Sequence, residues 1–312
     1  MNPLSTLFGA GVAIRNMLYD RGALRVQRLS RPVVSIGNIS VGGSGKTPFV
    51  IALGELLKQR GIQFDVLSRG YGRTSTQIAA VDLNGKPEDF GDEPLLIAHK
   101  LQVPVIVGAD RYQAGLFAEK TLSSQLHLLD DGFQHRQLRR DFDIVLLPQG
   151  DLADALLPVG RLREPPSSLR RADAIVTFST LELGDAAGTV WPARRSITLP
   201  AITGKAVAFC GIGRSRQFFD SVRALKPDIA DELAFGDHHR YRQSDVDRLL
   251  RLKRTAGAAS FITTAKDLIN LGGLSEQLQP LQTAELKIDL AAPGQALAHL
   301  LNTLEQRCGC RL

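Results

Sequence analysis

The sequence predicts an α/β protein with a doubly wound, mostly parallel sheet that carries a phosphate-binding loop. Three observations indicate this class: short apolar runs alternate with helical patterns, a glycine-rich turn follows the first run, and acidic residues end later runs. Such alternation is typical of parallel sheets, whose ligands lie at the carboxyl ends of the strands. We expect strands at 33–38, 64–67, 103–107, 126–129 and 142–147.

The composition is that of an ordinary globular protein. The chain has 312 residues, 44% of them hydrophobic and 22% charged, which excludes a disordered or fibrous chain. Its 3 cysteines are too few for a disulfide framework, and this favours a reducing compartment. The net charge of +6 suits a nucleotide, a nucleic acid or an acidic membrane surface, without choosing among them.

Glycines and prolines interrupt the pattern after residue 176, where we place a domain junction. We expect a membrane-interface helix with a basic flank over 1–30 and a P-loop nucleotide-binding domain over 31–180. A linker over 181–200 and a second, smaller α/β domain over 201–312 complete the prediction.

The first thirty residues form an uncharged apolar run followed by a basic stretch. Residues 2–14 carry no charge and are too few to span a bilayer, and several arginines follow them. This pattern suits a helix in the membrane interface, with its arginines paired to acidic headgroups. It suits equally a terminal helix docked on the protein's own core. The segment alone does not decide between these two interpretations.

A phosphate-binding loop is predicted between the first strand and the helix that follows it. Backbone N–H groups in such a loop point at phosphates, and the helix dipole favours an anion. Lys46 would neutralise phosphate charge, and the Thr47 hydroxyl would bind Mg²⁺. Ser40 departs from the general motif, which has glycine there, but the flanking strand and helix disfavour a chance glycine-rich turn. The candidate nucleotide-binding residues are Ser40, Val41, Gly42, Gly43, Ser44, Gly45, Lys46 and Thr47.

Acidic residues near later strands are candidates for the chemistry. Asp130 and Asp131 directly follow the run 126–129, as a magnesium-side carboxylate in a P-loop enzyme does, although aspartate is also common in turns. Asp92 precedes a helical run, where it either caps the helix or takes a proton from an attacking hydroxyl. Arginines in strand-end loops would supply positive charge, or are solvated surface residues: Arg69, Arg111, and Arg161 or Arg163.

The second half of the chain contains one unusual histidine pair. His238 and His239 lie between an acid and an aromatic residue, without the further ligands that zinc needs. A histidine that supports a carboxylate base across the domain junction and a structural histidine are both compatible with this pattern. The Lys266-Asp267 pair lacks the intervening residue of a guanine-reading motif.

Taken in order, these segments resemble the tetraacyldisaccharide 4′-kinases of lipid A biosynthesis. The order of the blocks makes the resemblance specific, since only the run 130–135 is distinctive by itself. Ala265 departs from the acidic residue expected in many relatives. The matching segments are 37–38, 42–48, 68–72, 91–94, 110–111, 129–135, 157–165, 235–239 and 263–264.

The resemblance implies ATP-dependent phosphorylation of the 4′-hydroxyl of a tetraacyldisaccharide 1-phosphate to form lipid IVA. The enzyme would work at the cytoplasmic face of the inner membrane of a Gram-negative bacterium, with ATP and Mg²⁺. Its partners would be the lipid A disaccharide in the membrane and an acidic phospholipid surface; no nucleic acid and no obligate protein partner are inferred. A substrate with four acyl chains stays in the bilayer, which favours the interface interpretation of the N-terminal helix.

The resemblance also assigns roles to individual residues. Asp92 would act as base, oriented by His238 from the second domain, which requires domain closure. The implied catalytic residues are Asp92, His238, Asp130, Asp131, Arg163 and Arg111, and the implied metal ligands are Thr47, Asp130 and Glu93.

Two other function classes compete with this interpretation. A P-loop metallochaperone switch would be favoured by a lysine at position 41 and a cluster of metal ligands, whereas the chain has Val41. A pure binding module would have no need of acids at three different strand ends.

Overall fold

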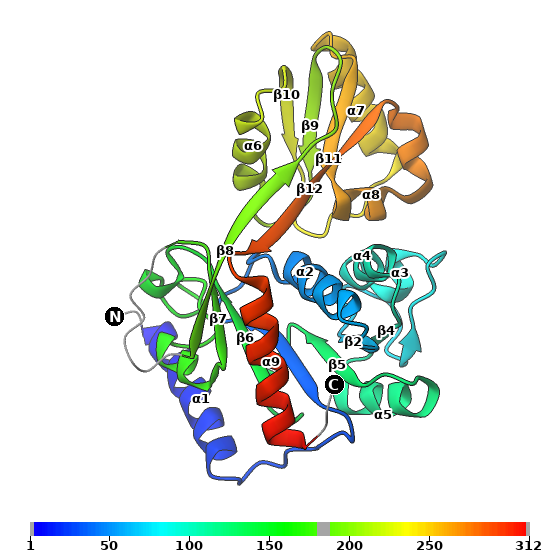
Figure 1. Cartoon of the computed structure of the whole chain (residues 1–312). Helices are drawn as coiled ribbons and strands as arrows, with labels where there is room; N and C mark the ends of the chain where they lie inside the picture. The colour runs from blue at the N-terminus through cyan, green and yellow to red at the C-terminus, as the bar shows by residue number, and fades with distance from the viewer. Residues whose placement is uncertain (1–2, 180–187, 310–312) are drawn as a thin grey trace.

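One continuous sheet runs through two α/β domains in the computed structural model, which describes residues 3–179 and 188–309 (Figure 1). Within these residues the strand order is β10-β9-β11-β12-β8-β7-β6-β1-β5-β2-β4-β3. Among the named strands of the described chain, antiparallel pairing is confined to β8 with β12 and β3 with β4. The predicted α/β class, with a mostly parallel sheet and a second, smaller α/β domain, is confirmed.

The part built on β1 to β7 is the N-terminal domain. Its strands are β1 (Val33–Asn38), β2 (Phe64–Ser68), β3 (Ala79–Ala80), β4 (Val105–Val107), β5 (Leu126–Asp130), β6 (Phe142–Leu147) and β7 (Ala174–Thr177). Its helices are α1 (Pro3–Asp20), α2 (Lys46–Gln59), α3 (Pro87–Phe90), α4 (Asp92–Leu101) and α5 (Arg111–Thr121), with short 3₁₀ turns at Asp151–Ala153 and Pro166–Arg171.

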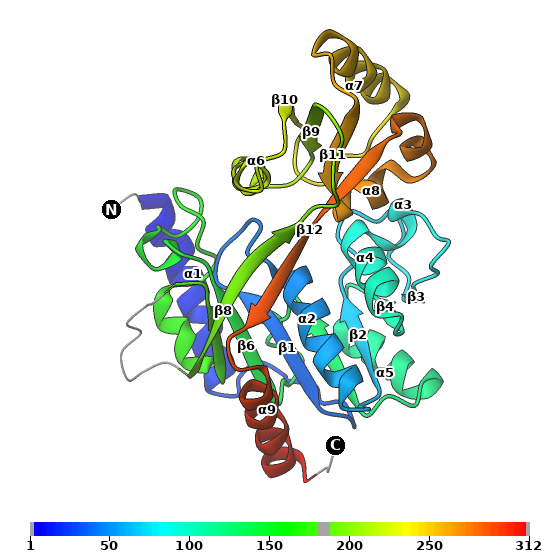
Figure 2. The same cartoon turned by 45° about the horizontal axis from the view of Figure 1, so that its top comes forward.

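The part built on β9 to β11 is the C-terminal domain. Its elements are β9 (Ala206–Cys210), α6 (Ser215–Ala224), β10 (Ile229–Ala234), α7 (Gln243–Thr255), β11 (Ser260–Thr264), α8 (Ala265–Leu271) and a 3₁₀ segment, Gly272–Leu278. The long strands β8 (Thr189–Thr198) and β12 (Leu281–Leu290) run between the domains, and α9 (Pro293–Cys308) follows β12. Figure 2 shows β8 and β12 crossing the junction side by side.

The central strands are buried along their whole length because helices cover both faces of the sheet. All residues of β1, β2, β5 and β6 are buried, which is the pattern that parallel strands show. Phe49 and Leu53 of α2 pack with Val34 and Ile36 of β1 in the largest apolar cluster. The parallel pairing of β1 with β5, and of β2 with β5, aligns the carboxyl ends of these strands at one edge.

The structure differs from the predicted domain boundaries in two places. Most of the predicted linker 181–200 is not a loop: β8 occupies 189–198, while residues 180–187 lie outside the described part. Helix α9, assigned from chain order to the C-terminal domain, packs on the N-terminal domain. Ala296, Leu300 and Leu304 recur every four residues on one face of α9 and are buried in the α2 and β6 cluster.

Helix α1 docks on the N-terminal domain through polar contacts and leaves apolar side chains exposed. Ser5 Oγ donates to the Leu156 carbonyl oxygen at 2.9 Å, and Asn16 Nδ2 donates to Glu164 Oε2 at 2.8 Å. Leu7 and Ile14 are 71% and 55% exposed on the same side of the helix. Among the described residues, no helix is both long and apolar enough to cross a membrane.

A buried histidine joins β2 to β5 near the amino ends of these strands, at the edge of the sheet opposite their carboxyl ends. The Nδ1 atom of His127 lies 2.9 Å from both carboxylate oxygens of its register partner Asp65, and Nε2 lies 3.6 Å from Glu119. Burial alone would lower the pKa of His127, but the hydrogen bond and charge of Asp65 and the charge of Glu119 raise it above the usual 6.5. The protonated imidazole is therefore the form that the folded state stabilises.

The free energy of unfolding should therefore fall as the pH rises from about 6.5 through the folded-state pKa of His127. We expect His127→Gln to lower the free energy of unfolding by roughly 1–3 kcal/mol at acidic pH and to flatten this dependence. Urea unfolding across this pH range measures both effects, with the exposed His99→Gln as control. If the free energy of unfolding of His127→Gln still falls over this pH range, another titratable group causes the dependence.

Candidate active site

The loop between β1 and α2 has the form that phosphate binding needs. Gly42 and Gly45 both have φ of 92°, a left-handed conformation that glycine adopts without the steric penalty of a side chain. Helix α2 begins at Lys46 and has no side-chain cap, so its first amides are available to an anion. We call residues 40–47 the phosphate loop.

The first two residues of the phosphate loop are tied to the protein itself. Ser40 Oγ donates to Asp151 Oδ2 at 2.5 Å, and the Val41 amide donates to the Arg161 carbonyl oxygen at 2.8 Å. The amide of Val41 is thus engaged within the protein. Ser40 and Val41 therefore anchor the loop, which leaves the predicted residues 42–47 as candidates for contact with a phosphate chain.

Asp131 forms ion pairs with Lys46 of the phosphate loop and with Arg163. Its carboxylate lies 3.4 Å from Lys46 Nζ and 3.0 Å from an Arg163 Nη1 donor. Burial would raise the pKa of Asp131, but the charges of Lys46 and Arg163 outweigh this effect and lower it. Asp131 has a φ of 51°, a conformation that residues other than glycine rarely adopt. The backbone at the end of β5 is thus held in a strained form that brings this carboxylate to Lys46.

Asp130 is a buried carboxylate with few donors. Its Oδ2 accepts from Ser68 Oγ at 3.1 Å, and its Oδ1 is buried without a hydrogen-bond partner. Burial, with the negative charges of Glu93 and Asp131, raises the pKa of Asp130 to about 7. A carboxylate in this state attracts a cation.

The predicted ligands suit a Mg²⁺ ion that shares phosphate oxygens. Mg²⁺ usually takes one or two protein carboxylates and completes its shell with phosphates and water. Asp130 and Glu93 repel one another, and Asp130 has an unpartnered oxygen, so a divalent cation would relieve both conditions. Within the described ranges, no three His, Cys, Asp or Glu side chains converge as a metal cage. Thr47 is buried in the first turn of α2.

Asp92 and His238 meet across the domain junction. Asp92 is the first residue of α4 and is 5% exposed; Gly91, not Asp92, is the N-cap. His238 Nδ1 lies 3.0 Å from Asp92 Oδ2, and Asn270 Nδ2 donates to the same oxygen at 3.0 Å. Burial would raise the pKa of Asp92, but the hydrogen bond from His238, the charge of Lys266 and the Asn270 donor lower it to about 2.

Lys266 joins the acids of one domain to the histidine of the other. Its Nζ lies 3.2 Å from Glu93 Oε1, 3.7 Å from Asp92 Oδ2 and 3.3 Å from His238 Nε2. An ammonium donor at Nε2 favours the tautomer in which Nδ1 carries the proton and donates it to Asp92. The hydrogen bond with Asp92 nevertheless raises the pKa of His238 above its usual value. The ring of Tyr71 lies beside this imidazole, with centroids 5.0 Å apart.

The remaining predicted residues divide between the site and the surface around it. Arg111 is buried at the start of α5, where burial and the charge of Arg69 lower its pKa, and the charges of Asp131 and Asp130 oppose this shift. Arg161 instead pairs with Asp154 at 2.8 Å, outside the group around Lys46.

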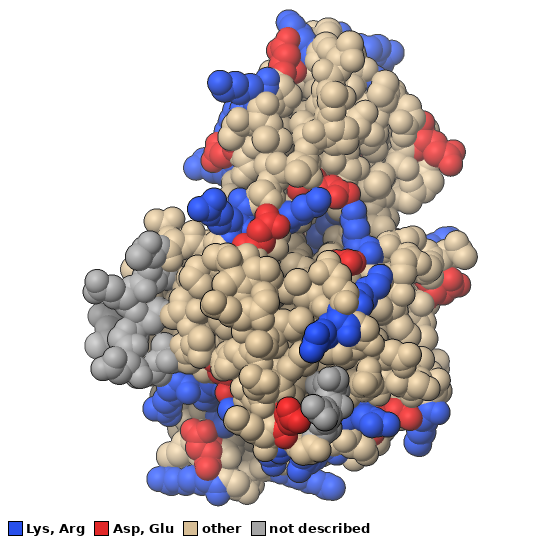
Figure 3. All heavy atoms as spheres, in the orientation of Figure 1, with Lys and Arg blue, Asp and Glu red and all other residues tan. Residues whose placement is uncertain are grey.

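Sequence reasoning missed four side chains at the junction. Lys266 and Asn270 lie four residues apart on α8, so their shared face was predictable although its target was not. Arg195 of β8 and Arg214 before α6 lie against the phosphate loop, and no sequence pattern indicated them. Figure 3 shows charged side chains of both signs gathered along the junction between the two domains.

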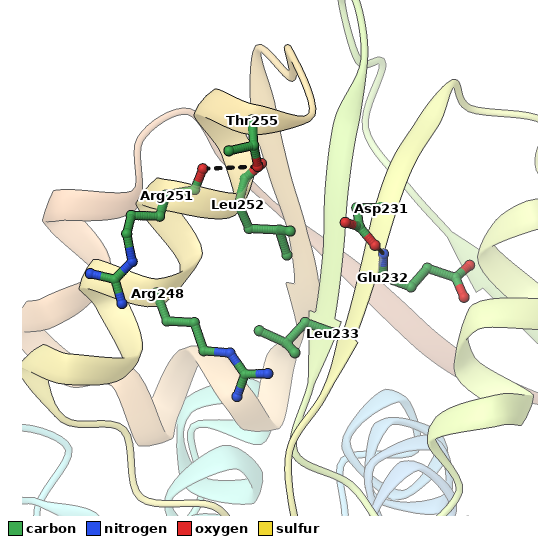
Figure 4. Close-up of a pocket in the computed structure, with 7 residues that line it drawn as sticks. All are labelled: Asp231, Glu232, Leu233, Arg248, Arg251, Leu252 and Thr255. Carbon is green, nitrogen blue, oxygen red and sulfur yellow. Dashed lines mark hydrogen bonds between the residues drawn. The ribbon is translucent and has the colours of Figure 1, made fainter.

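A separate cavity of about 380 Å³ lies on the C-terminal domain between β10 and α7 (Figure 4). None of its lining residues belongs to the group described above. They are Asp231, Glu232, Leu233, Arg248, Arg251, Leu252 and Thr255.

The arrangement has a clear chemical use. The N-terminal domain supplies both the anion-binding amides with Lys46 and the carboxylate of Asp92, which His238 of the C-terminal domain contacts. Transfer of a phosphoryl group to an alcohol needs both parts: positioned positive charge, and a group that receives the proton of the hydroxyl. The fold and the site therefore define a P-loop phosphotransferase.

Comparison with known proteins gives the family. The model of the tetraacyldisaccharide-1-P 4′-kinase family matches residues 1–305. A tetraacyldisaccharide 4′-kinase of Koribacter versatilis is 49% identical over 322 residues, covering 99% of this chain and 100% of the relative. That of Aquifex aeolicus is 38% identical over 291 residues, covering 87% and 89%. The chain belongs to the tetraacyldisaccharide 4′-kinase family of lipid A biosynthesis, as the sequence resemblance predicts.

A solved structure supports the same assignment. The crystal structure of LpxK from Aquifex aeolicus in complex with ATP has a TM-score of 0.79 and 34% sequence identity to this chain. The match covers 96% of this chain and 97% of that one, so both domains and their connection are shared.

The environment of Asp92 can be tested by removing the nearest cation. We expect Lys266→Met to raise the pKa of Asp92 above about 2, because its carboxylate would lose the positive charge 3.7 Å away. A ¹³C NMR titration of the Asp92 carboxyl group measures the change. The exposed Lys205→Met in the same domain should leave this titration unchanged. An unaltered Asp92 titration in Lys266→Met would assign the low pKa to His238 and Asn270 alone.

Proposed function

We propose that this chain transfers the γ-phosphoryl group of ATP to the 4′-hydroxyl of a tetraacyldisaccharide 1-phosphate, giving lipid IVA. It does so at the cytoplasmic face of the inner membrane of a Gram-negative bacterium. The observation that carries the proposal is the Asp92–His238 contact, which two domains build together in a member of this family.

ATP is the phosphoryl donor in this proposal. Its phosphate chain lies on the amides of residues 42–47, with Lys46 at the transferred group. Lys46 and Arg163 both pair with the carboxylate of Asp131. The γ-phosphate supplies a second anionic group with which both cations can pair. Arg111, buried near Asp130 and Asp131, steadies the charge that spreads over the transferred group. The Aquifex aeolicus relative solved with ATP supports this choice of nucleotide.

Mg²⁺ is the expected cofactor, held by Thr47, Asp130 and Glu93. When bound, it neutralises charge on the β- and γ-phosphate oxygens. The raised pKa of Asp130 and its unpartnered oxygen support this assignment.

Asp92 receives the proton of the attacking 4′-hydroxyl. A carboxylate with a pKa of about 2 is a weak base, so at equilibrium it deprotonates only a very small fraction of an alcohol. In a loose transition state, however, the proton becomes acidic only as the new P–O bond forms, so a hydrogen-bond acceptor in the right place is sufficient. His238 and Asn270 hold the carboxylate of Asp92 in a fixed direction from the other domain.

Catalysis is therefore linked to the approach of the two domains. Asp92 lies on α4 of the N-terminal domain, whereas His238, Lys266 and Asn270 belong to the C-terminal domain. The complete group forms only when the domains are together, and their approach excludes water that would otherwise hydrolyse ATP.

Helix α1 reaches the lipid substrate in the membrane interface. Its exposed Leu7 and Ile14 face away from the polar contacts that dock the helix, so they can enter the acyl boundary of the bilayer. The arginines after α1 would pair with acidic phospholipid headgroups.

The product of the reaction tests the function directly. Incubation of the protein with ATP, Mg²⁺ and a tetraacyldisaccharide 1-phosphate should yield a lipid heavier by one phosphoryl group, detected by mass spectrometry. Strong ATP hydrolysis without lipid, and no phosphorylated lipid, would instead indicate a nucleotide switch.

Asp92→Asn should lower kcat by roughly 100-fold to 10,000-fold while the KM for ATP changes little, because the amide keeps the shape but cannot accept the proton. Steady-state kinetics on lipid vesicles measure both constants. The exposed Asp228→Asn is the matched control. Near wild-type turnover in Asp92→Asn would show that another group receives the proton.

A double substitution, Leu7→Asp with Ile14→Asp, should weaken binding to vesicles of acidic phospholipid more than tenfold, because each leucine or isoleucine contributes about 1.5–3 kcal/mol when it leaves water. Vesicle sedimentation measures this, and ATP binding checks that the N-terminal domain is folded. Leu225→Asp, which changes an exposed apolar residue of the C-terminal domain, serves as control. Unchanged vesicle binding would place the membrane contact elsewhere.

A further inference from the structure

Two arginines reach the phosphate loop from the side of the C-terminal domain. Arg195 of β8 donates through Nη2 to the carbonyl oxygen of Ser44. A Cβ atom built on Gly45 would lie 3.5 Å from this nitrogen, and one built on Gly43 would lie 3.8 Å from the Arg214 side chain. Both arginines are therefore in contact with the glycines of the loop.

Their guanidinium groups are held in place but only partly satisfied. Arg195 stacks on the ring of Phe178, with its guanidinium carbon 3.9 Å from the ring centroid. The Nε atoms of Arg195 and Arg214, and Nη2 of Arg214, are buried without a hydrogen-bond partner. Buried donors of this kind cost free energy unless an acceptor reaches them. These buried donors lie beside the phosphate loop, whose first helical amides are also available to an anion.

The charge around these arginines is also unbalanced. Among the described residues, the one buried carboxylate near them is Asp151, which lies 3.9 Å from Arg214 and 3.4 Å from Arg161, and accepts from Ser40. Burial and the charge of Arg214 lower the pKa of Arg195 to about 10. Burial and the charge of Arg161 lower the pKa of Arg214. Within the described part of the chain, positive charge exceeds negative charge around these arginines, so a multivalent anion would be stabilised.

We propose that Arg195 and Arg214 bind the β-phosphate of the nucleotide, opposite the amides of the phosphate loop. The contact with Gly43 and Gly45 favours the phosphate chain over the phosphate of the lipid, because these glycines lie in the middle of the loop that cradles it. This inference rests on the proposed function in one respect, that the bound nucleotide is ATP.

The proposal gives the nucleotide a role in bringing the domains together. Lys46 and the loop amides belong to the N-terminal domain, whereas Arg214 belongs to the C-terminal domain and Arg195 to the strand that connects them. A phosphate chain bound by both sets of donors stabilises the closed arrangement, in which His238 contacts Asp92.

Nucleotide binding without lipid tests this proposal. Isothermal titration calorimetry with ATP, ADP and AMP, each with Mg²⁺, should be performed on the full chain and on Arg195→Gln and Arg214→Gln. We expect each substitution to weaken ATP and ADP binding roughly tenfold to hundredfold, the worth of a charge-assisted hydrogen bond, and AMP binding to change less than twofold. Arg214→Lys keeps the charge and should recover part of the loss. The exposed Arg216→Gln, two residues from Arg214, is the matched control and should bind ATP as the wild type does.

Three results would overturn the proposal. ATP affinity within twofold of the wild type in both variants would remove the arginines from the nucleotide site. Equal weakening of ATP and AMP would indicate a structural effect on the loop. Unchanged ATP affinity with a raised KM for the lipid would assign the arginines to the phosphate of the acceptor. Failure of the wild type to phosphorylate lipid would refute the kinase function but would leave these binding results valid.

Discussion

Strands β8 and β12 pair in antiparallel register from Ala193 with Leu290 to Thr198 with Glu285, and this pairing carries the sheet from one domain into the other. Each strand also pairs in parallel with a neighbour in one domain, β8 with β7 and β12 with β11. The two domains are thereby joined through one pair of strands. Side chains from both domains meet at this junction, as Lys266 does with Glu93.

The charges at the junction show how one site holds two buried carboxylates whose pKa values are shifted in opposite directions. Asp92 has three partners from the other domain, His238, Lys266 and Asn270, and remains ionised at every physiological pH. Asp130 has the hydroxyl of Ser68 as its donor and two acids nearby, so its pKa rises to about 7. Both are buried aspartates, and their neighbours alone set the difference. Asp92 thus stays an ionised hydrogen-bond acceptor, whereas a bound cation would stabilise the ionised form of Asp130.

Much of the fold and part of the site were predictable from local patterns. The apolar run 142–147 and the strand–loop–helix unit around Lys46 were found at their predicted places, because buried parallel strands and glycine turns leave signals within a few residues. Asp92 and His238 were predicted to meet through a family resemblance rather than through spacing. Helix α9 was misplaced, because its amphipathic face does not reveal which domain it covers.

The sequence by itself determined the class of sheet, the phosphate loop and the family, since each depends on residues that are neighbours along the chain or on the order of motifs. Only the tertiary structure decided that Lys266 lies between Glu93 and His238, and that Arg195 lies on the loop beside Ser44. These contacts join residues more than 100 positions apart in sequence, apart from Lys266 with His238. They depend on how the two domains, joined by β8 and β12, lie against one another, and that arrangement leaves no local signal in the chain.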